Sequence, residues 1–132
     1  MPLDPSQFNR NEAWILFRLN DAPVRTESDG DFDAMAIMEI TSGMIFGMEL
    51  VPLAEQQLSE LGSRRLLTAS AKQAGGRPAY LYVASEQEAE QLTIAAAAMG
   101  VTVRRVPESD LAAITREARE GFAAHISGGR AQ

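Results

Sequence analysis

The stretch DAMAIMEITSGMIFGMELV, residues 33–51, decides the fold because it holds two apolar runs separated by a turn signal. Asp33–Thr41 and Met44–Val51 are apolar at most positions, which favours strands buried on both faces. Ser42-Gly43 between them predicts a tight antiparallel hairpin, since glycine tolerates a positive φ. Gly47, inside the second run, indicates a bulge or a close packing contact.

Outward from this hairpin, the sequence predicts further strands and helices with short connections. A capping box of Ser85 and Glu88 marks the start of one helix, and Gly62 suggests a break in another. The expected strands lie at Ala13–Leu19, Ala79–Ala84 and Val101–Val106, and the helices at Pro52–Gln73, Ser85–Met99 and from Ser109 onward.

This order of elements predicts an α/β domain with a five-stranded mixed sheet. The first three strands follow one another through short links and are expected to be antiparallel. The later strand–helix–strand unit requires a right-handed crossover and a parallel pair. The expected domain spans residues 13–127, between a flexible N-terminal tail at 1–12 and a frayed end at 128–132.

Composition narrows the classes of function. The 132 residues contain no cysteine, which excludes disulfides, thiolate metal sites and thiol nucleophiles. The net charge of −6 arises in residues 1–51, which contain nine acidic and three basic residues. The sequence lacks the basic patch that would predict a nucleic-acid surface. The sequence contains no apolar run of about 18 residues, the length that would predict a membrane span, and no secretory signal is visible. We therefore expect a cytoplasmic protein.

The element order and several stretches of sequence resemble the ribonuclease H-like fold of ribonucleases H, integrases and transposases. Phe32–Val51 is similar to the hairpin of integrase-type cores, Gly76–Val83 to the stretch entering their fourth strand, and Gly100–Val103 to their fifth. The resemblance implies that the five strands, numbered along the chain, lie in the order 3-2-1-4-5 with helices on both faces.

The catalytic residues of that fold have no match here. Its enzymes place one carboxylate in the first strand and another at the end of the fourth, and a third completes a site for two metal ions. In this sequence Phe17 and Ala84 stand near the two strand positions. The resemblance therefore implies a non-catalytic interaction or scaffold domain without a cofactor.

Two displaced carboxylates support an alternative, a metal-dependent hydrolase or nuclease. Asp21 follows the first strand and Glu86 follows the fourth, so both are expected at the carboxyl edge of the sheet, where open α/β sheets bind ligands. With Asp110 or Glu117 they could hold Mg²⁺ or Mn²⁺. In a purely structural role, Asp21 belongs to a turn and Glu86 stabilises a helix N-terminus. A small-ligand site at this edge also remains open.

The hairpin is rich in methionine, which adapts its shape to partners and to cores alike. The second strand of the hairpin, which is the third along the chain, lies at an edge of the sheet in the implied order, and an apolar edge needs cover. We therefore expect a homodimer or a protein partner at the hairpin. The candidate interface residues are Met35, Met38, Met44, Phe46 and Met48.

Overall fold

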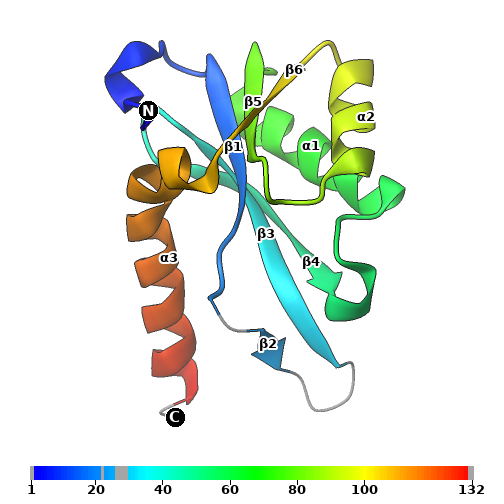
Figure 1. Cartoon of the computed structure of the whole chain (residues 1–132), viewed down its shortest axis with the longest axis vertical. Coiled ribbons are helices and arrows are strands. Elements are labelled where there is room, and N and C mark those ends of the chain that lie inside the picture. The colour runs from blue at the N-terminus through cyan, green and yellow to red at the C-terminus, as the bar shows by residue number, and fades with distance from the viewer. Residues whose placement is uncertain (1, 22, 26–29, 131–132) are drawn as a thin grey trace.

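The computed structural model describes residues 2–21, 23–25 and 30–130, the side chains of 125–130 excepted (Figure 1). The strands are β1 (Ala13–Arg18), β2 (Val24–Arg25), β3 (Asp31–Glu39), β4 (Ile45–Pro52), β5 (Tyr80–Ala84) and β6 (Thr102–Val106). The helices are α1 (Glu60–Ala74), α2 (Glu90–Ala98) and α3 (Glu108–Arg130), with short 3₁₀ turns at Pro5–Gln7 and Leu53–Glu55. None of the described helices is both long enough and apolar enough to cross a membrane.

The strands form one mixed sheet whose order matches the predicted one. β4 pairs with β3, β3 with β1, β1 with β5 and β5 with β6. The pairs that involve β3 are antiparallel, and β1–β5 and β5–β6 are parallel. The two-residue strand β2 was not predicted, because so short a segment carries no periodic signal; it pairs with the beginning of β3.

The connection between β3 and β4 is longer than the predicted two-residue turn. β3 ends at Glu39 and β4 begins at Ile45. Ile40 still binds β1, since its N–H donates to the carbonyl of Ala13. The loop then turns at Gly43, whose φ is +74°, as expected of a glycine there.

A bulge lies in β4 beside the loop. Ile37 pairs with Gly47 whereas Met38 pairs with Ile45, so Phe46 is an extra residue on the β4 side. Gly47 also makes the predicted close contact, since a Cβ there would lie 2.8 Å from Oγ of Ser70 on α1.

Two apolar clusters sit on opposite faces of the sheet. Trp14 and Leu16 of β1 point into the cluster under α1 and α2, while Ile15 and Phe17 point into the cluster under α3. β1 and β3 are thus buried on both faces, as predicted. β4 is not, since Leu50 and Met48, which pair with Ala34 and Ala36, are exposed. No helix among the described residues covers that face at this edge of the sheet.

Two helix starts differ from the prediction. The region after Pro52 forms only a 3₁₀ turn, Gln56 adopts a left-handed conformation, and α1 begins after the N-cap Ser59, so Gly62 lies in its first turn rather than at a break. The Ser85–Glu88 capping box does not form either, because the N–H of Ser85 donates to the carbonyl of Val106 and α2 begins only at Glu90.

The N-terminal segment, predicted as a flexible tail, contacts the α3 face of the sheet. Asp4 caps the turn Pro5–Gln7, and hydrogen bonds from the Ser6 backbone and hydroxyl hold the pKa of Asp4 below its ordinary value. Leu3 N–H donates to the carbonyl of Asp110, and the Phe8 ring packs edge-on against Tyr82. At the other end, α3 continues to Arg130, beyond the expected domain end at 127.

Candidate functional site

A cavity of about 180 Å³ opens at the carboxyl ends of the parallel strands β1 and β5, where open α/β sheets bind ligands. One wall is the end of β1, and another is Ala84 with the loop that follows it. These two walls consist of Leu16, Phe17, Arg18, Ala84, Glu86 and Gln87. The third wall is one face of α3, with Glu108, Leu111, Thr115 and Arg119.

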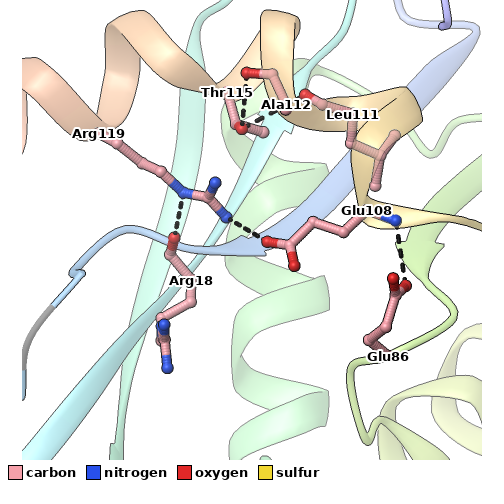
Figure 2. Close-up of polar contacts among 7 residues, drawn as sticks. All are labelled: Arg18, Glu86, Glu108, Leu111, Ala112, Thr115 and Arg119. Carbon is pink, nitrogen blue, oxygen red and sulfur yellow. Dashed lines mark hydrogen bonds and ion pairs between the residues drawn. The ribbon is translucent and has the colours of Figure 1, made fainter.

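Arg119 is the central polar side chain of this cavity (Figure 2). Its Nε donates to the carbonyl of Arg18 at 2.9 Å, and its Nη2 pairs with Oε1 of Glu108 at 3.3 Å. Its guanidinium carbon lies 5.7 Å from the centre of the Phe17 ring, within the range of a cation–π contact. A fixed positive charge therefore lies against the end of β1.

Glu86 has a defined partner at the start of α3. Its Oε1 accepts the backbone N–H of Glu108 at 3.0 Å (Figure 2). The first N–H groups of a helix lack intrahelical partners, and a carboxylate there also interacts favourably with the helix dipole. Glu86 therefore stabilises a helix N-terminus, as in the structural role considered for it, although the helix is α3 rather than the one that follows it in sequence.

The loop between β5 and α2 is held in place by Arg105 of β6. Its Nη1 donates to the carbonyl of Ala84 at 2.8 Å and also to the carbonyl of Gln87. These bonds tie the residues after β5 into a turn, which sets Glu86 beside α3.

The other predicted metal ligands do not line this cavity. Asp21 lines a separate hollow with Arg116, Arg119 and Glu120, whereas Glu86 lines the cavity between β1 and β5. Glu117, on the exposed side of α3, lines neither. Among the residues the structure describes, no group of three or more acidic or histidine side chains is placed to hold a metal ion.

The fold of this chain recurs in a solved structure. The catalytic core domain of BIV integrase matches with a TM-score of 0.54 at 10% identity, covering 89% of this chain and 73% of that one. The chain has the ribonuclease H-like fold. The HTLV-2 integrase catalytic core domain, in complex with magnesium and in a dimeric form, matches with a TM-score of 0.48 at 9% identity, covering 76% of this chain and 63% of that one. No protein-family model matches the chain, and no curated protein matches it.

Within the ribonuclease H-like fold, the structure places Phe17 and Ala84 in one cavity. They lie on neighbouring parallel strands, since Leu16 pairs with Val83 and the next residue of each strand lines the cavity wall. These are the two positions at which the resemblance led us to look for carboxylates. The sequence did not reveal Arg119, because nothing in the pattern of α3 distinguishes it from Arg116 one turn earlier.

A second surface lies at the β4 edge of the ribonuclease H-like sheet. Of the predicted interface residues, Met35 and Met38 are buried in the core, and Phe46 packs edge-on against Trp14. Met44 and Met48 are exposed. The exposed apolar residues of this edge, here called the β4 patch, are Met44, Ile45, Met48, Leu50 and Leu53.

The opposite edge of the sheet, β6, has a different character. It is five residues long and carries Arg104 and Arg105, both exposed. The Arg104 guanidinium lies 3.9 Å from the centre of the Tyr80 ring. Charged side chains on a short edge strand discourage pairing with another chain, so β6 is protected where β4 is not.

Proposed function

We propose that this ribonuclease H-like domain is a non-catalytic interaction module that self-associates through β4. The observation that carries the proposal is the β4 patch, a group of exposed apolar side chains on an edge strand and at its two ends. An edge strand also presents unpaired backbone N–H and C=O groups, which a second strand can satisfy.

The chemistry of the cavity at β1 and β5 supports the non-catalytic part. Two-metal phosphodiester chemistry needs carboxylates that hold ions about 4 Å apart. Phe17 and Ala84 offer no side-chain oxygen ligand. The two carboxylates of the cavity, Glu86 and Glu108, already bind the N-terminus of α3 and Arg119, and the Arg119 guanidinium would repel a divalent cation in the same space. The residues present therefore do not fit the metal ions of the enzymes that share this fold.

A second copy of the chain is the partner that best fits the β4 patch. Two β4 strands paired antiparallel about a two-fold axis would give a self-complementary contact and one continuous sheet. Met48 is 51% and Leu50 50% exposed, on the face that α3 leaves open. Since burying a whole side chain of this size contributes about 1.5–3 kcal/mol, covering the exposed half contributes roughly 1 kcal/mol for each.

The mass in solution, measured by size exclusion with light scattering, tests this proposal in matched variants. Met48→Lys places a charge in the β4 patch, and Ile94→Lys places one at an equally exposed position on α2, where Ile94 is 58% exposed. We expect wild type and Ile94→Lys to form dimers, and Met48→Lys to be a monomer with an unchanged circular dichroism spectrum. A dimeric Met48→Lys protein would show that β4 is not the contact.

A further inference from the structure

We infer that the cavity between β1, β5 and α3 binds a small zwitterion, an α-amino acid with a short apolar side chain. This site is separate from the β4 patch, so the inference goes beyond the proposed self-association and does not depend on it.

The size of the cavity limits the ligand. Its volume is about 180 Å³. An apolar protein cavity of about 150 Å³ accepts a benzene molecule, so this one has room for roughly six to eight non-hydrogen atoms. Alanine and valine fit this limit, whereas a nucleotide or a dipeptide with large side chains does not.

The polar atoms of the cavity carry both signs of charge, and each group keeps some capacity to bind. Arg119 uses Nε and Nη2 for Arg18 and Glu108, and its Nη1 has no hydrogen-bond partner among the described residues (Figure 2). Glu86 and Glu108 each use only Oε1 in the contacts drawn there. One guanidinium nitrogen and two carboxylate oxygens thus remain for a ligand.

These charges favour a zwitterion over a simple ion. A carboxylate without an ammonium group would pair with Arg119 but would be repelled by Glu86 and Glu108. An amine without a carboxylate would pair with the two glutamates but would be repelled by Arg119. An α-amino acid places one charge against each, and such complementarity gives specificity by rejecting ligands that carry only one of the two.

The remaining wall is apolar and suits a short side chain. Phe17, Ala84 and Leu111 line it, and all three are buried. Thr115 donates its hydroxyl within α3, at 3.3 Å to the carbonyl of Leu111, so it adds no free donor to this wall. An aliphatic side chain in this space would be removed from water without leaving a polar group unpaired.

The inference is tested by titrating the ¹⁵N-labelled chain with valine, isovalerate and isobutylamine and following the amide resonances. Isovalerate lacks the ammonium group of valine, and isobutylamine lacks its carboxylate. We expect valine to shift resonances of residues around the cavity, and the other two compounds to bind at least tenfold more weakly. Equal binding of isovalerate or isobutylamine, or no response to valine, would overturn the inference.

The valine titration is repeated with variants in which one charged residue of α3 is replaced. Arg119→Gln and Glu108→Gln each remove one charge that the ligand needs, so each is expected to weaken valine binding at least tenfold. Arg116→Gln is the matched control, because Arg116 is exposed on the same helix and lines a different hollow. If Arg119→Gln does not fold, Glu108→Gln decides the matter, and valine binding of wild-type strength in that variant would contradict the inference.

Discussion

Replacing Gly47 by alanine would place a methyl group between β4 and α1. A Cβ at residue 47 would lie 2.8 Å from Oγ of Ser70 and 3.1 Å from Cδ1 of Leu66. Carbon contacts are most favourable at about 3.5–4.0 Å, and both neighbours are buried, so neither can move aside freely. Overpacking of this kind costs about 1–3 kcal/mol, and we expect Gly47→Ala to lower the free energy of unfolding by that amount.

Urea unfolding followed by the fluorescence of Trp14, the single tryptophan, measures this change. Ser70→Ala provides the partner variant, because its buried hydroxyl has no hydrogen-bond partner among the described residues. Removing that hydroxyl should leave stability unchanged or raise it by up to about 1 kcal/mol. In the double variant the nearest clash is gone, so the two effects should differ from additivity by about 0.5 kcal/mol or more. An additive double variant, or a Gly47→Ala protein as stable as wild type, would refute this description of the β4–α1 contact.

Three further predictions concern the carboxylates. Glu86→Ala removes the acceptor of the Glu108 N–H, and urea unfolding should show a loss of about 1 kcal/mol, typical of a lost helix cap. Glu39→Ala leaves the Ser42 hydroxyl and the Asn11 N–H without their acceptor and should cost about 1–3 kcal/mol in the same assay, whereas an unchanged midpoint would contradict that role. Millimolar Mn²⁺ should not raise the melting temperature of wild type; a rise that Asp21→Ala abolishes would revive the metal-dependent hydrolase.

The strands themselves were predictable because they have strong local signals, whereas their order was expected from the resemblance to the ribonuclease H-like fold. Trp14–Phe17 is an unbroken apolar run in β1, and the hairpin at 33–51 leaves only an antiparallel pairing for its two strands. The start of α2 was not predictable, since the Ser85–Glu88 pattern is a good local cap. This cap does not form, because Arg105 and Val106 bind the loop after β5 through tertiary hydrogen bonds.

The strand ends that line the candidate site could be predicted from the sequence, but the side chain that α3 contributes could not. Phe17 and Ala84 were expected at neighbouring strand ends, and they line one cavity. Arg119, which lines this cavity, comes from α3, a distant segment whose rotation about its axis is set by packing. For the same reason the sequence could not show that Met38 lies in the core while Met48 is exposed, since both stand in similar apolar runs.

Cysteine cross-linking tests the central claim, pairing of two β4 strands, most directly. The chain has no cysteine, so a single introduced thiol can join only two copies. We would treat Met48→Cys with a short bis-maleimide at low micromolar concentration and compare it with Ile94→Cys, which is as exposed but lies on α2. The account predicts a covalent dimer for Met48→Cys and monomer for Ile94→Cys. Monomer for both, or equal yields of dimer, would contradict it.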